Sequence, residues 1–160
     1  MKTYLVTGAA GFIGSNFVKY LLKKYGEDIQ IIIVDALTYA GNLASIKDEI
    51  ELDNVSFVKS DIADYETIKS VFTNNDIDYV VNFAAESHVD RSITNPKLFL
   101  ETNIIGTQNM LQCAREAWYV GKDEMGNPVY KDGVKYLQIS TDEVYGSLEK
   151  EFEEAQPLHV

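Results

Sequence analysis

Residues 7–14 read TGAAGFIG and decide the fold of this chain. The stretch follows an apolar run and precedes apolar residues at helical spacing, so it should join a strand to a helix. Its glycines suit a tight turn at Gly8, close backbone approach of a pyrophosphate at Gly11, and helix–strand contact at Gly14. Taken alone, the stretch would equally fit a glycine-rich turn that binds nothing.

Asp35 adds a second feature, about 20 residues beyond the glycine stretch at the end of the next apolar run. A carboxylate at this place accepts hydrogen bonds from the hydroxyls of an adenosine ribose. It also repels a 2′-phosphate, and no Lys or Arg follows before Lys47, which favours NAD over NADP. A P-loop would need Gly-Lys-Ser/Thr, but the chain continues Gly14-Ser15-Asn16. The two features together predict dinucleotide binding.

Apolar runs and helical patterns alternate along the chain. Continuous aliphatic runs are typical of parallel strands that are covered on both faces. We therefore expect an α/β fold with a doubly wound parallel sheet of the Rossmann type, with about five strands. Strands are expected at 3–7, 29–34, 55–58, 79–83 and 136–140, and helices at 12–25, 43–50, 65–72 and 96–118.

The last part of the chain is less regular. Residues 121–133 are rich in turn-forming residues and predict a surface excursion. Residues 136–140 read as a buried strand, which should also be the bare edge of the sheet and invite association. Residues 147–160 are acidic and predict a loop.

Composition narrows the possible partners. The 160 residues carry a net charge of −11, from 25 acids and 14 bases. This length predicts one domain, and the acidity argues against nucleic acid or an anionic membrane as a partner. One cysteine, Cys113, and two histidines, His88 and His159, predict no disulfide and no metal site. Neither a signal peptide nor a span of ~20 apolar residues is recognisable, so a cytoplasmic location is expected.

Five further stretches are distinctive: DALTYAGNLASI at 35–46, SDI at 60–62, NFAAESHVDRSI at 82–93, TNIIGT at 102–107 and STDEVYGS at 140–147. Together they resemble the dTDP-glucose 4,6-dehydratases, which are extended short-chain dehydrogenase/reductases. The resemblance runs over essentially the whole chain and implies NAD as cofactor, the nucleotide sugar dTDP-glucose as substrate, and a homodimer in the whole protein. Related sugar-nucleotide epimerases share the Ser…Val-Tyr-Gly pattern but lack the adjacent Asp and Glu.

The resemblance also implies roles for single residues. Ser87 and His88 should face the substrate. Ordinary structural roles remain open: Asp61 could cap a turn, His88 could be a plain loop residue, Asn103 could bond backbone, and small residues such as Ala84 could simply allow close packing. Around the cofactor we expect Gly8, Gly11, Phe12, Ile13 and Gly14 at the pyrophosphate, Asp35, Leu37 and Thr38 at the ribose, Asp61 and Ile62 at the adenine, and Ala84, Ala85, Glu86 and Thr102 on the nicotinamide side.

Thr141, Asp142 and Glu143 follow the last expected strand. In the resembling enzymes NAD oxidises the sugar at C4, water is lost across C5 and C6, and the hydride returns to C6. By resemblance Asp142 is the acid, Glu143 is the base, and Thr141 binds the C4 oxygen. Adjacent carboxyl groups in a partly dry pocket push their pKa values apart, which would give one acid and one base. A solvated acidic loop is the alternative.

The oxidation step of these enzymes uses a Tyr-x-x-x-Lys pair on a helix beyond this strand. The pairs Tyr20/Lys24 and Tyr65/Lys69 have the spacing but lie on early helices, so we reject them. Residues 1–160 are therefore expected to be an incomplete NAD-binding Rossmann domain, without that helix or a substrate domain, and inactive alone. The alternatives are a nucleotide-sugar epimerase or reductase and a non-catalytic NAD-binding module.

Overall fold

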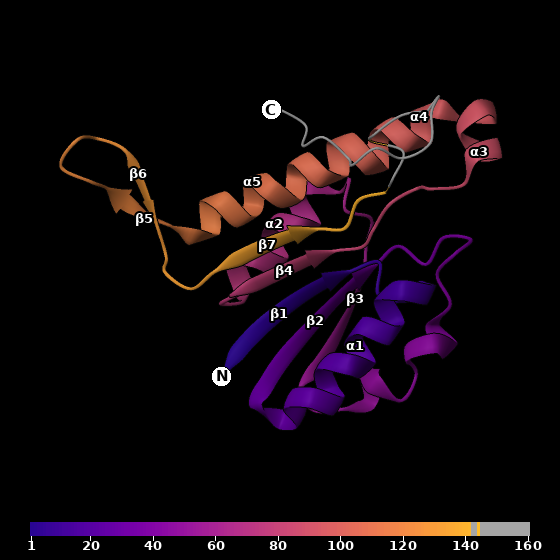
Figure 1. Ribbon diagram of the computed structural model, residues 1–160, viewed down its shortest axis with the longest axis horizontal. Helices are drawn as coiled ribbons and strands as arrows, with labels where there is room; N and C mark the ends of the chain where they lie inside the picture. Colours follow the sequence, from indigo (N-terminus) through magenta and orange to yellow (C-terminus); the bar gives the residue numbers. More distant parts are fainter. Residues whose placement is uncertain (142–143, 145–160) are drawn as a thin grey trace, which may run out of the picture.

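β1, the apolar run before the glycine stretch, is the central strand of a five-stranded parallel sheet. A computed structural model describes residues 1–141 and residue 144, and the sheet within them has the order β3-β2-β1-β4-β7 (Figure 1). The chain winds outward from β1 in both directions, so the predicted doubly wound fold is confirmed. The strands span Lys2–Thr7 (β1), Ile29–Asp35 (β2), Val55–Lys59 (β3), Tyr79–Asn82 (β4) and Lys135–Gln138 (β7).

Helices cover both faces of the sheet because its central strands are apolar on both faces. In β2, Ile31 and Ile33 pack with α1, whereas Ile32 and Val34 join the cluster formed with α2 and α5. Figure 1 shows α1 on one side of the sheet and α2 and α5 on the other. The helices span Phe12–Tyr25 (α1), Tyr65–Asn74 (α2) and Thr107–Trp118 (α5).

The prediction of a helix at 43–50 is wrong. Two short 3-10 turns, Leu43–Ile46 (η2) and Glu49–Glu51 (η3), stand in its place. The Asn42 side chain caps the first turn, and Ile46 is the one buried residue in the two turns. A single buried anchor does not provide the apolar stripe by which a longer helix docks on a sheet.

The helix expected at 96–118 is continuous but changes its winding. α4 (Pro96–Phe99) leads into a π-helical segment, η4 (Leu100–Gly106), and then into α5. A short helix, α3 (Val89–Thr94), precedes it and is missing from the sequence prediction. α3 has only six residues and buries none of them, so it is too short for helical periodicity to indicate it from the sequence.

β7 is less buried than its sequence predicts. It pairs with β4 and, within the described residues, forms the last strand of the sheet, so the expected edge is confirmed. The expectation that this strand is buried is wrong: Leu137 is 52% exposed, and Tyr136 is the one half-buried residue of the strand. An edge strand lacks a neighbour on one side, and this position cannot be read from an aliphatic run.

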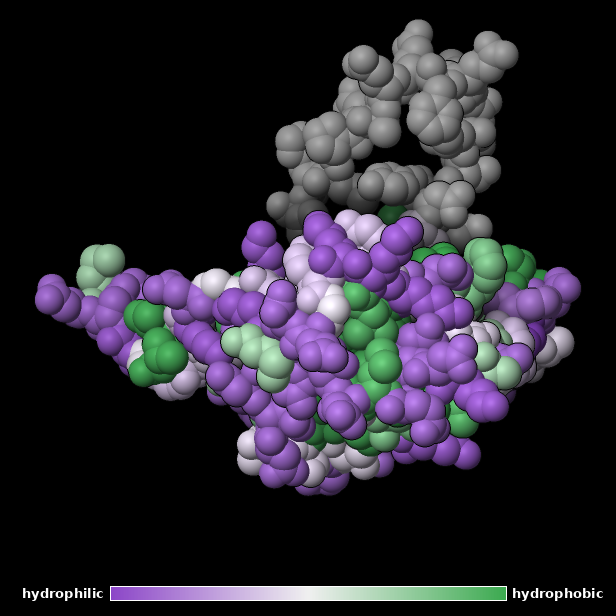
Figure 2. All heavy atoms as spheres, turned by 90° about the horizontal axis from the view of Figure 1, so that it is seen from below, coloured by the Kyte–Doolittle hydropathy of each residue, from purple (hydrophilic) through white to green (hydrophobic). Residues whose placement is uncertain are grey.

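The turn-rich residues before β7 form an antiparallel hairpin of β5 (Tyr119–Lys122) and β6 (Pro128–Tyr130). The hairpin projects from the body of the protein, at the left of Figures 1 and 2. The predicted surface excursion is confirmed, although its strands are not part of the prediction. Among the residues that the structure describes, none belongs to a helix long and apolar enough to cross a membrane.

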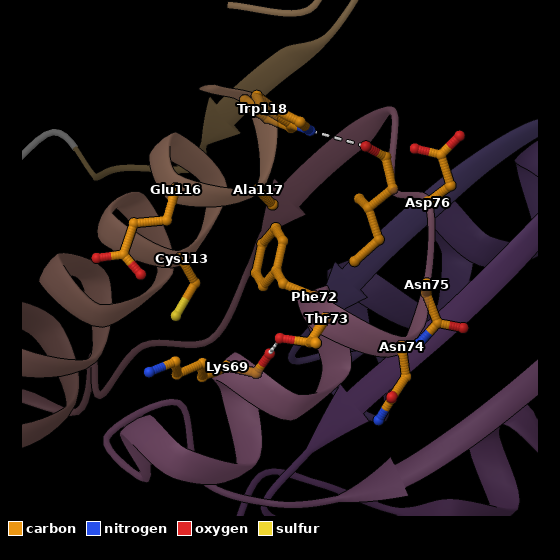
Figure 3. A pocket seen from close by; sticks show the side chains of 11 residues that line it. Lys69, Phe72, Thr73, Asn74, Asn75, Asp76, Cys113, Glu116, Ala117 and Trp118 are labelled. Carbon is orange, nitrogen blue, oxygen red and sulfur yellow. Dashed lines mark hydrogen bonds between the residues drawn. The ribbon is translucent and has the colours of Figure 1, made fainter. Parts of the chain in front are cut away.

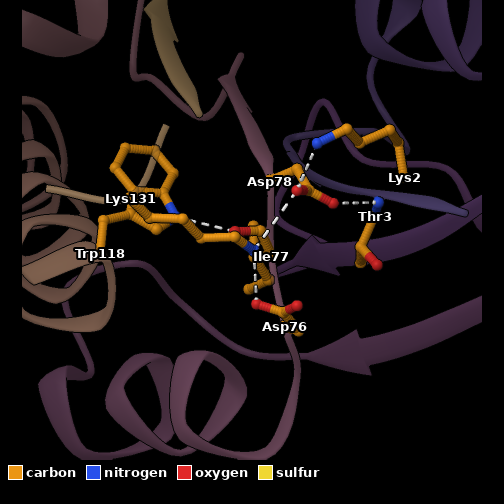
Figure 4. Close-up of polar contacts among 7 residues, drawn as sticks. All are labelled: Lys2, Thr3, Asp76, Ile77, Asp78, Trp118 and Lys131. Atoms are coloured by element: carbon orange, nitrogen blue, oxygen red, sulfur yellow. Dashed lines mark hydrogen bonds and ion pairs between the residues drawn. The ribbon is translucent and has the colours of Figure 1, made fainter. Parts of the chain in front are cut away.

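A polar cluster fastens the amino ends of β1 and β4 to the hairpin (Figure 4). Asp78 is 5% exposed, and its Oδ1 accepts hydrogen bonds from Lys2 Nζ at 2.8 Å and Lys131 Nζ at 3.4 Å. Its Oδ2 accepts one from Thr3 N at 3.0 Å. Burial acts to raise the pKa of Asp78, but these donors outweigh burial and the pKa is lowered. Lys131 also pairs with the exposed Asp76 at 2.7 Å.

Replacing Asp78 with Asn should destabilise the protein by about 2 kcal/mol, because Thr3 N and the two lysines lose a charged acceptor that is itself buried. The matched variant Asp76→Asn, whose side chain is 87% exposed, should cost well under 1 kcal/mol. Since the folded pKa of Asp78 is lowered, its contribution should be full above the unfolded pKa of about 3.9 and fade as the pH falls through the folded value. Urea denaturation between pH 7 and pH 2 measures both effects, and equal losses in the two variants would contradict the burial argument.

Candidate functional site

A cleft of about 390 Å³ opens at the carboxyl ends of the strands. Its walls come from the loops that follow β1, β2, β3, β4 and β7, together with Leu98 and Thr102 from the α4–η4 helix. The chain reverses its winding direction between β1 and β4, and open α/β sheets bind ligands at such a point. The topology therefore gathers loops that are distant in sequence around one cleft.

The glycine turn forms the floor of this cleft. Gly8 has a φ of +65°, and a Cβ there would lie 2.7 Å from Ala84 N, so the predicted tight turn is confirmed. A Cβ on Gly14 would lie 2.8 Å from Ala9 Cα, which confirms the close contact expected at the start of α1. At Gly11 the nearest atom to a Cβ would be Gly8 O at 3.2 Å, so its other side is open to a ligand.

Asp35 connects the end of β2 to the glycine turn. Its buried carboxylate accepts hydrogen bonds from Ala10 N through Oδ2 and from Leu37 N through Oδ1, both at 2.8 Å. Each oxygen keeps a further lone pair for a ligand hydroxyl. Gly41 is a residue that sequence reasoning missed: a Cβ there would lie 2.9 Å from Asp35 Oδ1. The side chain of Asp35 therefore organises the loops as well as facing the cleft.

Most of the predicted site residues line this one cleft. Two described residues do not: Leu37, with a φ of +52°, packs against the core on the α1 side, and His88 lies edge-on to the Tyr39 ring at 6.3 Å. Asp142 and Glu143 lie outside the described residues, and neither rejected Tyr/Lys pair lines the cleft. The predicted residues that line it are Gly8, Gly11, Phe12, Ile13, Gly14, Asp35, Thr38, Asp61, Ile62, Ala84, Ala85, Glu86, Ser87, Thr102 and Thr141.

Asp61 and Asn103 both have the structural roles that the sequence left open. Asp61 caps a turn by accepting a hydrogen bond from Ala63 N at 2.9 Å, and it lines the cleft as well. The Asn103 side chain, in the π-helical segment, holds the backbone of Glu86 with two hydrogen bonds of 2.8 Å each. The Glu86 carboxylate is buried, and its Oε2 has no hydrogen-bond partner among the described residues.

A chain of polar side chains crosses the sheet just beneath the cleft. The Thr7 hydroxyl bonds Asn82 Oδ1, and Asn82 Nδ2 donates to Gln138 Oε1 at 2.8 Å. The Tyr136 hydroxyl donates to the same Gln138 oxygen at 3.1 Å, and burial raises the pKa of Tyr136 to about 12, so the donor stays protonated at neutral pH. These bonds tie β1, β4 and β7 together. They therefore fix the loops that follow those strands relative to one another.

Charge in the cleft limits how it could hold an anion. Its lining includes the carboxylates of Asp35, Asp61 and Glu86 but no Lys or Arg among the described residues. A phosphate would have to bind backbone N–H groups at the amino end of α1, a helix of 14 residues with no side-chain cap. The described residues contain no cluster of His, Cys, Asp and Glu that could hold a metal ion.

A second pocket, of about 480 Å³, lies between α2 and α5 at the opposite end of the sheet (Figure 3). Lys69 of a rejected Tyr/Lys pair is at its wall, together with Phe72, Cys113 and Trp118. Burial raises the pKa of the Cys113 thiol to about 11, which makes it a poor nucleophile. None of the predicted site residues lines this pocket.

Fold and cleft together define a protein of the Rossmann-type NAD-binding fold. The chain matches the sequence model of the GDP-mannose 4,6 dehydratase family over residues 5–160, and it belongs to that family. It is 45% identical to a dTDP-glucose 4,6-dehydratase of Xanthomonas campestris over 92% of this chain and 40% of that protein. It is 48% identical to a probable dTDP-glucose 4,6-dehydratase of Sinorhizobium fredii over 96% of this chain and 42% of that protein. The predicted resemblance is thereby confirmed, and the chain spans about two fifths of the length of these curated relatives.

Solved structures agree with this assignment. The dTDP-glucose 4,6-dehydratase of Bacillus anthracis in complex with NAD matches with a TM-score of 0.76 and 40% identity, over 99% of this chain and 44% of that one. The UDP-Glc/GlcNAc 4-epimerase of Campylobacter jejuni matches with a TM-score of 0.78 but 26% identity, over 99% of this chain and 43% of that one. The fold is thus shared with both kinds of enzyme, whereas sequence identity is higher to the dehydratase.

Gly8→Ala should destabilise the protein by about 3 kcal/mol, since it combines a strained φ with a clash against Ala84. Gly26→Ala is a matched control, because Gly26 has a φ of +56° and no atom within 4 Å of a Cβ. Its ψ of −127° lies outside the left-handed helical region, so Gly26→Ala should show backbone strain alone, about 2 kcal/mol. Urea denaturation of both variants measures the difference, and identical losses would show that the packing at Gly8 has no special role.

Proposed function

We propose that this protein binds NAD in the cleft and supplies the NAD-binding part of a dTDP-glucose 4,6-dehydratase. The observation that carries the proposal is the meeting of the glycine turn, Asp35 and Thr141 around one cleft. The turn suits a pyrophosphate, Asp35 suits a ribose, and Thr141 immediately precedes the expected acid–base residues in the sequence. The homodimer, the cytoplasmic location and the lack of a nucleic-acid partner stay predictions.

Relatives support NAD as the cofactor. The Bacillus anthracis dehydratase was solved with NAD, and that of Streptomyces venezuelae with NAD and a second ligand. The cleft of this chain fits the same molecule, because Gly11 leaves open space beside the turn and the buried Asp35 retains acceptor capacity. Bound NAD would supply a reversible hydride acceptor. Phe12 and Ile13 would lie over the pyrophosphate, and Ala84, Ala85 and Glu86 would lie on the nicotinamide side.

The proposed reaction converts dTDP-glucose to dTDP-4-keto-6-deoxyglucose by oxidation at C4, loss of water across C5 and C6, and return of the hydride to C6 together with a proton to C5. In it Glu143 removes the C5 proton while Asp142 protonates the leaving C6 hydroxyl. Thr141 binds the C4 oxygen and Ser87 faces the sugar, whereas His88 lies beside Tyr39 and outside the cleft lining. We assign residues 1–160 to the NAD-binding domain, and the proposed activity belongs to the whole protein.

Asp35→Asn tests the cofactor assignment. NAD should bind about tenfold to a hundredfold more weakly, because a ribose acceptor loses its charge. The preference for NAD over NADP should also shrink, since the repulsion of a 2′-phosphate is gone. Calorimetric titration with both cofactors measures this. A merely structural role in holding Ala10 and Leu37 would weaken both cofactors equally and leave the preference unchanged.

Glu143→Gln and Asp142→Asn test the reaction in the whole protein. Each should lower kcat for dTDP-glucose by about 10² to 10⁴ while leaving NAD affinity unchanged, because general acid–base groups act on the substrate and not on the cofactor. NMR analysis of the wild-type product separates the alternatives. A 4-epimer would favour the epimerase, and NAD binding without turnover would favour a non-catalytic module.

A further inference from the structure

The loops that follow β2 and β4 contact each other through an aromatic ring and a cation. The Arg91 guanidinium carbon lies 3.9 Å from the centre of the Tyr39 ring, which is a stacking distance. Arg91 Nη1 also lies 3.8 Å from Oε2 of the buried Glu86. Tyr39 belongs to the loop after β2, and Arg91 to α3 after β4.

The position of this contact follows from the order of the strands. β2 and β4 are not neighbours in the sheet: β1 and its glycine turn lie between them. Strands are about 4.8 Å apart, so the two loops are joined across about 10 Å. Thr38 and Ala40, on either side of Tyr39, line one wall of the cleft, and Glu86 lines the wall near Arg91. Tyr39 and Arg91 themselves do not line the cleft.

We propose that Tyr39 and Arg91 form a strap that joins the loops after β2 and β4 across the glycine turn, holds these two walls of the cleft together and thereby slows the release of a dinucleotide. The inference rests on the proposed function, because it assumes that NAD is the occupant. In the proposed reaction the hydride returns to the sugar, so each turnover regenerates the cofactor and no exchange is needed. Slow release of NAD therefore does not limit the rate of turnover.

Core packing does not explain the contact. Tyr39 is 54% exposed, and α3 buries none of its residues. The strap is thus held by its own interactions and can open without disturbing the core. Arg91 also places a positive charge next to Oε2 of Glu86, a buried oxygen of the acidic cleft lining that has no hydrogen-bond partner among the described residues.

The test is the dissociation rate of NADH, followed by stopped-flow fluorescence on displacement with excess NAD. Tyr39→Ala and Arg91→Ala should each release NADH about three to five times faster, which is the effect of losing one exposed cation–π contact. The double variant should be no faster than Arg91→Ala, because Arg91→Ala already removes the contact that Tyr39→Ala removes. Tyr39→Phe keeps the ring and should release NADH at the wild-type rate.

Tyr20→Ala is the matched control. Tyr20 is also 54% exposed and has a cation, Lys24, 5.6 Å above its ring, but both residues lie on α1, so their contact joins no two loops of the cleft. Unchanged release from Tyr39→Ala, or faster release from Tyr20→Ala as well, would overturn the strap. Failure of the wild-type protein to bind NADH would instead overturn the proposed function, and the strap with it.

Thermal unfolding of Tyr39→Ala should match the wild type, and a lowered Tm accompanying faster release would assign the effect to folding and contradict the strap.

Discussion

The close approach of Gly8 to the backbone of Ala84 is the constraint on which the cleft depends. The glycine turn leaves the central strand with a positive φ and passes within van der Waals contact of the loop after β4. On its other side, Asp35 holds Ala10 and so ties the same turn to the end of β2. One turn is thereby fixed between its two neighbouring strands. The positions of the remaining walls follow from it, because each is the continuation of a strand in the same sheet.

Much of this could be predicted from local sequence. The strands appear as aliphatic runs because they are covered on both faces, and α1 was predicted with its observed bounds because Val18 and Leu21 mark one buried face. The sequence did not show which strand lies at the edge or how the long helix is wound. Those properties depend on neighbours: β7 is exposed because of its place in the sheet, and the π-helical segment is where Asn103 bonds to a separate loop.

The residues of the candidate site likewise fall into those that local sequence predicts and those that only the structure reveals. Residues such as Gly11, Asp35 and Asp61 follow strands directly, so topology alone brings them to one end of the sheet. Leu37 shares that position in sequence, but its positive φ turns it toward the core. The bonds from Thr7 through Asn82 to Gln138 join residues far apart along the chain, and no local pattern indicates them. A functional motif thus predicts which loops meet, whereas the contacts between them require the structure.

Trp118 is the only tryptophan of the chain, and its place in the fold has a practical consequence. Its indole N–H donates to Ile77 O at 2.7 Å, just before β4 begins, while the cleft lies where β4 ends. Tryptophan emission therefore originates at the end of the sheet opposite the cleft, where no nucleotide is expected to bind. Its fluorescence can therefore report unfolding at the end of the molecule that carries the β5–β6 hairpin, without direct quenching by a ligand in the cleft.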